Sequence, residues 1–279
     1  MSNNILTNKQ FSFCDKVSTE SAIFKLIESI FSARNNKEYI MGLFCDLTKA
    51  FDSVSHELLI LKLEFYEVKG SVLNWLKSYL HNRLQRVVLQ FVTSPNLLSD
   101  LEVVGHGVPQ RSVLHPLPFN VYINDFPCII NKVSHTILFA DDTNILVSSS
   151  NLNELNSKLN SVLHCISKWF EIKQLALDLN KTHIVKFATS KLLTYPLNIV
   201  YNNQALTVSE NITFLGMHLN CNLTWKSHTD NFIKQLILIC CMLRKLLPIV
   251  NVKCYTWFIL HISVHRSVMA QFSGVHLHQ

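Results

Sequence analysis

Two adjacent aspartates, Asp141 and Asp142, are the residues of this chain whose type and spacing most directly suggest chemistry. Apolar, partly β-branched runs flank them on both sides and predict two buried strands. The polar Asp-Asp-Thr-Asn segment between the runs predicts the turn of a hairpin. Two carboxylates held together at a tight turn offer the oxygen ligands that hard divalent cations prefer. From this segment alone, a solvated turn that only reverses the chain is the favoured interpretation.

A third aspartate, Asp46, ends an apolar run over residues 39–45 that predicts a buried strand. An isolated Asp in this position is better interpreted as a cap of the following turn than as a site residue. Together with the hairpin, however, Asp46 completes the three carboxylates that a two-metal phosphoryl-transfer site needs. Two Mg²⁺ ions about 3.5–4 Å apart would lower the pKa of an attacking hydroxyl and stabilise a leaving pyrophosphate.

The elements that must position these aspartates are helices and strands in alternation, with one hairpin among them. Apolar residues at helical spacing predict helices over 18–33 and 152–170, from about residue 55, from about residue 71, and through 119–123. Strands are predicted over 39–45, 183–188 and 212–219, and over 86–104 with a turn at 94–96. This order favours an α+β fold over a doubly wound parallel sheet.

Composition excludes several classes of protein. The 279 residues are rich in apolar side chains and poor in Gly and Pro, as in a globular chain, and the net charge of +6 is compatible with nucleic acid without requiring it. The eight cysteines form no C-x-x-C pair, and the thirteen histidines form no metal-binding motif, which excludes a zinc finger and a disulfide framework. The polar N-terminus and the short apolar runs predict neither a signal peptide nor a membrane span, so an intracellular location is expected.

Five motifs follow one another along the chain: F-x-D-L-x-K-A-F-D from Phe44, G-V-P-Q-x-S-V-L-x-P from Gly107, F-A-D-D from Phe139, Asn180-Lys181-Thr182, and Phe214-Leu215-Gly216. Their order and spacing resemble the reverse transcriptases of non-LTR retrotransposons, especially the jockey-like group. The resemblance runs from about residue 18 to about residue 245. It implies a polymerase palm, an antiparallel sheet backed by helices, over residues 1–245, with partial fingers. Residues 246–279 then form an aberrant or truncated start of a thumb.

The resemblance also implies a role for each matching residue. Asp46, Asp141 and Asp142 match the catalytic metal ligands, and Lys181 matches the lysine that assists pyrophosphate departure. Nucleotide-binding positions fall on Leu47, Phe51, Gln110 and Arg111, and the primer-binding segment falls on Phe214, Leu215 and Gly216. Phe51 corresponds to the bulky residue that selects deoxynucleotides by blocking a ribose 2′-OH. Each position also has a structural interpretation, as a core Phe, a turn Gln, a surface Lys or a strand-to-turn junction.

The chain departs from the family at three positions of one motif. Arg111 and His115 replace glycines, and Pro118 replaces a residue that is usually Leu. A side chain at position 111 occupies space where the backbone should approach nucleotide and template closely. Pro118 costs about 3 kcal/mol inside a helix but much less in its first turn. The basic fingers motifs expected before residue 18 are also missing, and no endonuclease domain precedes the polymerase motifs, so we do not expect autonomous transposition.

The sequence therefore predicts an RNA-directed DNA polymerase domain of non-LTR retrotransposon origin, in a truncated copy. Its expected cofactor is Mg²⁺ as two ions, with Mn²⁺ as a substitute, and its expected partners are template RNA, a DNA primer and dNTPs, without a membrane. The oligomeric state stays open. The alternative hypothesis is a catalytically dead remnant with at most residual nucleic-acid binding. An unrelated two-metal nuclease would not account for the G-V-P-Q and F-L-G motifs.

Overall fold

The computed structural model describes residues 5–14, 17–89, 97–109, 112, 114, 116–130, 133–187, 199–201 and 204–246. At its centre lies a five-stranded sheet with the order β11-β8-β1-β7-β6. The strands are β1 (Tyr39–Cys45), β6 (His135–Phe139), β7 (Asp142–Ser149), β8 (His183–Phe187) and β11 (Thr207–Val208). β1 pairs antiparallel with β7 and β8, and β6 pairs antiparallel with β7. The short β11 runs parallel to β8, so the sheet is mixed, whereas the family resemblance implied an antiparallel one.

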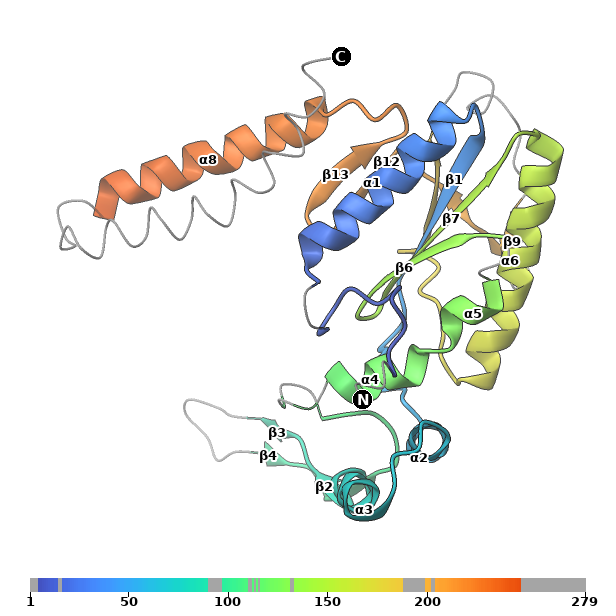
Figure 1. Ribbon diagram of the computed structural model, residues 1–279. Coiled ribbons are helices and arrows are strands. Elements are labelled where there is room, and N and C mark those ends of the chain that lie inside the picture. The colour runs from blue at the N-terminus through green and yellow to red at the C-terminus, as the bar shows by residue number, and fades with distance from the viewer. Residues whose placement is uncertain are drawn as a thin grey trace.

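The central strand β1 separates two hydrophobic clusters. Since successive side chains of a strand point to opposite faces, Met41 and Leu43 enter the cluster that includes α6 (Leu152–Ile172). Ile40 and Phe44 enter the other cluster, with α1 (Thr19–Asn35) and the hairpin of β12 (Asn211–Phe214) and β13 (Met217–Asn220). Figure 1 shows α1 and α6 on opposite sides of the sheet. The fold is therefore α+β, as predicted, with helices packed on both faces of the central sheet.

Polar caps begin the predicted helices where the sequence places them. Ser18 accepts a hydrogen bond from the Ser21 amide at the start of α1, and Ser55 accepts one from Leu58 at the start of α2 (His56–Phe65). These caps satisfy amides that have no partner within the helix. The predicted starts of both helices and of α6 are confirmed to within a residue or two.

Pro118 lies in the first turn of α4 (Pro116–Ile123), which is followed by the short helix α5 (Phe126–Ile130). Amides in the first turn of a helix have no intrahelical acceptor, so a proline there removes no hydrogen bond of the helix. Pro118 therefore falls at the less costly of the two positions considered from the sequence, and it is buried.

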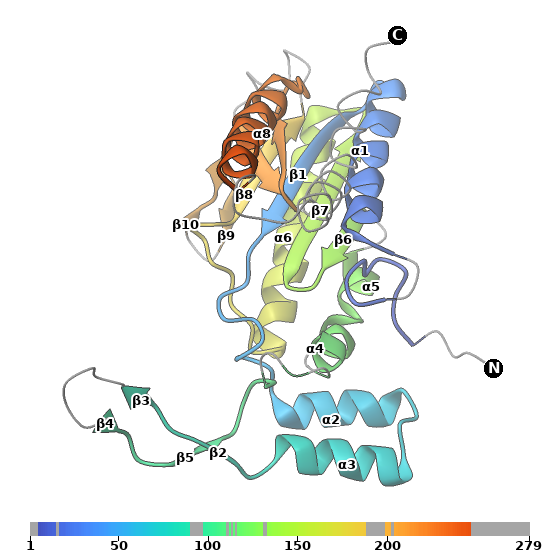
Figure 2. The same ribbon diagram turned by 90° about the vertical axis from the view of Figure 1, so that its left-hand side faces the viewer.

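A smaller group of elements lies beyond one end of the sheet (Figure 2). α2 packs against α3 (Gly70–Leu80), and two short pairs of strands extend away from these helices: β2 (Arg83–Gln85) with β5 (Glu102–Val104), and β3 (Val88–Leu89) with β4 (Leu97–Leu98). The predicted strand character of residues 86–104 is thus confirmed in parts, and the turn predicted at 94–96 lies outside the described residues. A further pair, β9 (Val200–Tyr201) with β10 (Gln204–Ala205), lies beside α6.

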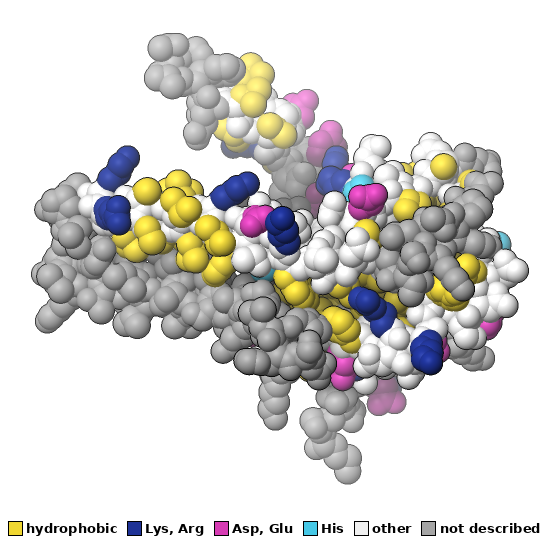
Figure 3. Space-filling model, turned by 90° about the horizontal axis from the view of Figure 1, so that it is seen from above, with side chains coloured by type: hydrophobic (Ala, Val, Ile, Leu, Met, Phe, Trp, Pro, Cys, Tyr) yellow, Lys and Arg dark blue, Asp and Glu magenta, His cyan; other side chains and the backbone are white. Residues whose placement is uncertain are grey.

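The long helix α8 (Lys226–Leu246) projects from the body of the molecule (Figure 1). Its hydrophobic side chains lie exposed along the projecting arm in Figure 3, among them Ile233, Ile237, Leu238 and Met242. Among the described helices, α8 included, none combines the length and apolar character that a membrane span requires. Beyond Leu246, the segment expected to form an aberrant thumb lies outside the described residues.

Two details of the predicted elements are wrong. Thr143 and Asn144 belong to β7 rather than to the turn, which consists of Ala140 and Asp141, because Phe139 pairs with Asp142. Residues 212–219 form a hairpin of two strands instead of one strand, since Phe214 pairs with Met217. In both places a two-residue turn reverses the chain, and the pattern of apolar and polar residues alone does not show where that turn lies.

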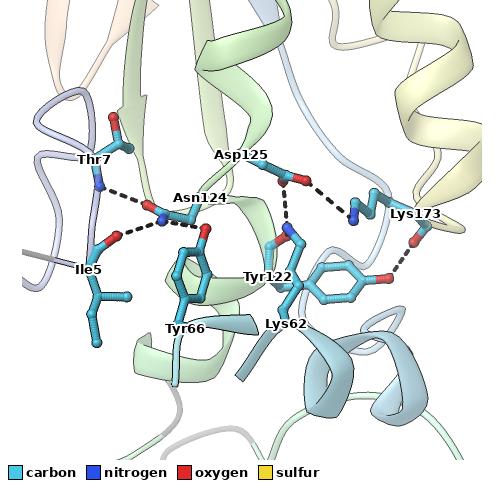
Figure 4. A network of polar contacts seen from close by, with 8 residues as sticks. All are labelled: Ile5, Thr7, Lys62, Tyr66, Tyr122, Asn124, Asp125 and Lys173. Atoms are coloured by element: carbon cyan, nitrogen blue, oxygen red, sulfur yellow. Dashed lines mark hydrogen bonds and ion pairs between the residues drawn. The ribbon is translucent and has the colours of Figure 1, made fainter. Parts of the chain in front are cut away.

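Polar contacts join α2, the α4–α5 junction and the end of α6 (Figure 4). The Lys62 ammonium lies 2.5 Å from Asp125 Oδ1 and also donates to the Tyr122 carbonyl, while Lys173 lies 3.4 Å from Asp125 Oδ2. Burial lowers the pKa of Lys62 to about 8, against the opposing effect of Asp125. Nearby, the Asn124 side chain accepts from the Thr7 amide and donates to the Ile5 carbonyl and to Tyr66 Oη. The network fixes the N-terminal segment and α2 beside the sheet.

Candidate active site

The register of the sheet and one ion pair bring together three of the predicted site residues. Cys45 pairs with Thr143 across β1 and β7, so the next step of this antiparallel register sets Asp46 opposite Asp142. On the other side of β1, Leu47 bridges to Leu177 and the Asp178 amide donates to the Asp46 carbonyl, so Asp178 lies opposite Asp46. The turn that follows Asp178 brings the Lys181 ammonium to 3.3 Å from Asp46 Oδ2. Residues opposite one another share a face of the sheet, and their Cβ atoms lie about 4.5–5.5 Å apart. Lys181, Asp46 and Asp142 therefore form a row across one end of the sheet.

Asp46 is held by the segment that leads into β8. Its amide donates to Thr182 Oγ1 at 3.4 Å, and its carbonyl accepts from the Asp178 amide at 2.9 Å. The Lys181 ammonium lies 3.3 Å from Asp46 Oδ2 and 3.6 Å from Asp178 Oδ2. The hydrogen bond to Asp46 and the charges of both carboxylates raise the pKa of Lys181, so this lysine stays cationic at neutral pH.

The hairpin turn presents Asp141 and Asp142 at the end of the row. Ala140 adopts a positive φ of +54°, a conformation that costs a residue with a Cβ on the order of 1–2 kcal/mol. Asp142 is exposed, yet its surroundings raise its pKa to about 6, through desolvation first and then through the charges of Asp141 and Asp46. Asp141 and Asp46 therefore both lie within electrostatic reach of the Asp142 carboxyl.

The donor types suit a hard divalent cation, because carboxylate oxygens are the ligands that Mg²⁺ prefers. No three His, Cys, Asp or Glu side chains within the described residues are gathered closely enough to hold a metal ion as they stand. One reason is visible at Asp46, whose Oδ2 faces Lys181. Each Asp side chain has two rotatable bonds, so the register sets which carboxylates can converge while their rotamers set whether they do.

The turn after β1 places the other residues of the first motif. Leu47 is only 4% exposed and its side chain belongs to the core, so a nucleotide could contact its backbone alone. Phe51 is partly buried and packs on Phe119, with ring centroids 4.5 Å apart. Its aromatic ring therefore has the core role considered from the sequence, and part of it remains accessible.

The G-V-P motif packs against this turn through its backbone. Val108 donates to the Phe51 carbonyl at 2.9 Å, and Gly107 donates to the Val54 carbonyl at 2.8 Å. Gly107 has a φ of +84°, and a Cβ there would lie 2.9 Å from the backbone of Asp52, so only glycine fits. Gln110 and Arg111 follow directly and lie outside the described residues, as does His115. The motif is thus anchored beside Phe51 up to the point where the nucleotide-binding residues are expected.

The Phe214-Leu215-Gly216 segment forms the turn of the β12–β13 hairpin. Leu215 and Gly216 both have positive φ, +47° and +85°, as a two-residue hairpin turn with the twist of its strands requires. Phe214 is buried, with its ring centroid 6.3 Å from that of Phe44, two residues before Asp46 on the same strand face. The predicted primer-binding turn consequently lies on the face of the sheet that carries Asp46.

The sequence reasoning missed two residues that contact the hairpin turn, Gln10 and Ser12. The Ala140 amide donates to Ser12 Oγ at 2.7 Å and to Gln10 Oε1 at 3.3 Å. Both residues precede the first predicted helix, in a segment without helical or strand periodicity. No local signal in the sequence pointed to this contact, because it joins positions about 130 residues apart.

The chain is similar in sequence to several curated proteins. The chain is 30% identical over 80% of its length to a probable RNA-directed DNA polymerase from transposon BS of Drosophila melanogaster, covering 25% of that protein. It is 27% identical over 80% of its length to the RNA-directed DNA polymerase from mobile element jockey of the same species, covering 24% of it. The chain thus spans about a quarter of the length of these curated relatives.

Among solved structures, the chain is similar to telomerase from Candida albicans in complex with the TWJ fragment of telomeric RNA. The TM-score is 0.47 and the sequence identity is 13%, and the match covers 75% of this chain and 36% of that chain. Apo telomerase from Candida tropicalis, truncated from its C-terminal domain, has the same TM-score and identity over 72% of this chain and 39% of that chain.

The family profile described as reverse transcriptase (RNA-dependent DNA polymerase) matches residues 1–219, which include every site residue discussed above. By this match, and by its similarity to polymerases of non-LTR retrotransposons, the chain belongs to the reverse transcriptase family.

Proposed function

We propose that this chain extends a DNA primer on an RNA template, with Asp46, Asp141 and Asp142 as its catalytic carboxylates. The observation that carries the proposal is the row formed by Lys181, Asp46 and Asp142, in which the β1–β7 register and the Lys181–Asp46 ion pair bring residues of three separate motifs to one end of the sheet. The raised pKa of Asp142 supports it, since Asp141 and Asp46 act on that carboxyl through their charges.

In the proposed reaction, a primer 3′-oxygen forms a bond to the α-phosphorus of a dNTP. The bond from that phosphorus to the bridging oxygen breaks, pyrophosphate departs with the electron pair, and the hydroxyl proton passes to solvent. Two Mg²⁺ ions, held by the three aspartates, would supply activation of the hydroxyl and neutralise charge on the leaving group. The cationic Lys181 would stabilise the departing pyrophosphate from its place beside Asp46.

The other assignments follow the same arrangement. Phe51 is the proposed selector of deoxynucleotides, together with the backbone of Leu47 and with Gln110 and Arg111. Phe214, Leu215 and Gly216 are the proposed primer-binding turn. We further propose that residues 1–245 form the palm with partial fingers and that residues 246–279 begin a thumb. A location inside the cell follows from the need for RNA template and dNTPs.

Primer extension on an RNA template tests the proposal. Asp46→Asn should abolish extension, because the amide supplies weaker cation ligation, while the unfolding temperature stays close to that of the unsubstituted chain. Asp100→Asn is the matched control, since this exposed aspartate lies between β4 and β5, beyond the central sheet, and should leave extension unchanged. If Asp46→Asn and the unsubstituted chain extend primers equally well, the assignment of Asp46 is wrong.

Primer extension by an Arg111→Gly variant distinguishes the proposed polymerase from a catalytically dead remnant. The remnant hypothesis is favoured by the arginine at a position where the family has glycine. Extension by both chains supports an active polymerase, and extension by Arg111→Gly alone locates the lesion at residue 111. If neither chain extends a primer–template that both bind, the remnant hypothesis replaces the proposal.

A further inference from the structure

The N-terminal segment runs along the outer edge of the sheet beside the catalytic hairpin. Gln10 bridges to Leu138 of β6 in parallel, with the Phe11 amide donating to the Leu138 carbonyl and the Leu138 amide donating to the Lys9 carbonyl, both at 2.9 Å. Since β6 is the last strand on its side of the sheet, the segment covers an edge that would otherwise be unpaired. The backbone of residues 9–11 therefore fixes the strand that leads into the turn.

Side chains of the same segment reach the turn itself. Ser12 Oγ accepts from the Ala140 amide at 2.7 Å and donates to Gln10 Oε1 at 3.0 Å. Gln10 Oε1 also accepts from the Ser12 amide at 3.1 Å and from the Ala140 amide at 3.3 Å. Gln10 and Ser12 are each 3% exposed, so water does not compete for these bonds.

The buried amide of Gln10 shows what this contact requires. Its Nε2 is buried and has no hydrogen-bond partner among the residues that the structure describes. An apolar side chain of similar size would avoid this unpaired group, but it would also remove the acceptor for three donors. The amide oxygen is therefore the atom through which the Gln10 side chain stabilises the turn.

The turn needs support from outside because its conformation is unfavourable for its sequence. Ala140 has a positive φ although it carries a Cβ, and it lies next to Asp141. Without the bond to Ser12, the turn can relax toward a more ordinary conformation, and the positions of Asp141 and Asp142 change with it.

Further contacts hold Ser12 in place. Asn120 Nδ2 of α4 donates to the Ser12 carbonyl at 3.0 Å, and Asn124 binds the segment through Thr7 and Ile5 (Figure 4). The turn is thus connected through Ser12 to α4, which follows the G-V-P-Q motif in the chain.

We propose that Ser12 and Gln10 are positioning residues that hold the Ala140 turn and so set the placement of Asp141 and Asp142 for cation binding. This inference rests on the proposed function, because it assigns the metal-binding role to these carboxylates. It extends that function to a segment that lies outside the five motifs and contributes no ligand of its own.

Ser12→Ala in the full 279-residue chain tests the proposal, with Ser134→Ala as matched control. Ser134 is also a buried serine, 7% exposed, but its hydroxyl donates to the Ile130 carbonyl at 2.7 Å and not to the turn. Ser12→Thr, which retains the hydroxyl, is the rescue variant. Ser12→Cys, with similar volume and a weak acceptor, replaces Ser12→Ala if that chain does not fold.

The first measurement is hydrogen exchange at the Ala140 amide, and the second is Mn²⁺ binding by the chain alone, followed by paramagnetic resonance. Ser12→Ala should speed exchange at Ala140 and weaken Mn²⁺ binding about three- to tenfold, the size of one lost hydrogen bond. The Mg²⁺ concentration for half-maximal primer extension should rise by a similar factor. Ser12→Thr should restore these values, and Ser134→Ala should leave them unchanged.

Unchanged exchange at Ala140 in Ser12→Ala overturns the proposal, as does faster exchange with unchanged Mn²⁺ binding and unchanged Mg²⁺ dependence. Equal effects of Ser12→Ala and Ser134→Ala would show that Ser12 has only a general structural role, and this result also overturns the proposal. If the unsubstituted chain neither binds Mn²⁺ nor extends primers, the proposed function fails, and the claim that Ser12 positions these carboxylates for a cation falls with it. Faster exchange at Ala140 would then show a structural clamp only.

Discussion

At the scale of single residues, Asp142 lowers the stability of the fold that presents it. Its pKa rises from 3.8 to about 6, so the folded chain binds more protons than the unfolded chain between these values. Unfolding free energy therefore increases as the pH falls from about 7 toward 4, to the extent that Asp142 determines it. A residue kept at such a cost is typical of functional sites.

Asp142→Asn should consequently stabilise the protein at pH 8 while abolishing primer extension. The amide carries no charge to repel Asp141 and Asp46, so the unfolding temperature should rise by a few degrees at most, because Asp142 is exposed and solvent screens its charge. At pH 4 most of the gain should be lost, since the folded chain then protonates residue 142 almost completely and the unfolded chain, with a pKa of 3.8, protonates it in part. Thermal unfolding at both pH values checks this, and a gain that is equal at pH 4 and pH 8 would contradict it.

At the scale of elements, the strands and helices differ in how far the sequence alone predicts them. β1, α1 and α6 are predicted nearly to the residue because their apolar patterns and caps are local. The pattern predicts a turn over residues 141–144, but the turn consists of Ala140 and Asp141, because Thr143 and Asn144 are polar yet buried in β7. Asn144 Nδ2 donates to the Ile137 carbonyl at 3.3 Å, a contact across the hairpin that satisfies the buried amide and leaves no signal in the local pattern.

The β12–β13 hairpin and α8 should respond differently to the same kind of substitution. Leu219 of β13 is 2% exposed and belongs to the cluster around α1, so Leu219→Ala should cost about 2–4 kcal/mol of unfolding free energy. Leu238 of α8 is 56% exposed, so Leu238→Ala should change stability by no more than about 0.5 kcal/mol. Urea unfolding of the two variants measures both. A loss at Leu238 as large as that at Leu219 would show that α8 packs against more of the chain than its exposure indicates.

At the scale of the whole molecule, the candidate site could be predicted only in part. The sequence predicts that Asp46, Asp141, Asp142 and Lys181 belong together, through motifs that resemble those of a family. It does not predict the row of Lys181, Asp46 and Asp142, since strand register and ion pairs depend on contacts between distant segments. It also does not predict the support of the turn by Gln10 and Ser12, because that segment has no periodic pattern and its contacts with the turn, β6 and α4 are long-range.

The layered core predicts an uneven distribution of local stability. β1 lies between two strands and two hydrophobic clusters, whereas β3, β4 and most described side chains of α8 are exposed. Amide hydrogen exchange should therefore be slowest in β1 and β7 and fastest in β3, β4 and α8, because exposed elements open without disrupting the core. Mass spectrometry of exchanged peptides tests this order. Protection of α8 equal to that of β1 would contradict it.

Because strand register sets Asp46 opposite Asp142, different kinds of mutation in copies of such a gene should differ in their effect on the site. A substitution in β1 or β7 changes one side chain and leaves in place the pairing that sets Asp46 opposite Asp142. An in-frame insertion or deletion of a single codon within one of these strands shifts the pairing by one residue and moves its site residue to the opposite face of the sheet. Such changes in strand length should therefore reduce primer extension more severely than most single-residue replacements. Gene copies that retain their strand lengths also retain the strand pairing, so that a point reversion could restore the site.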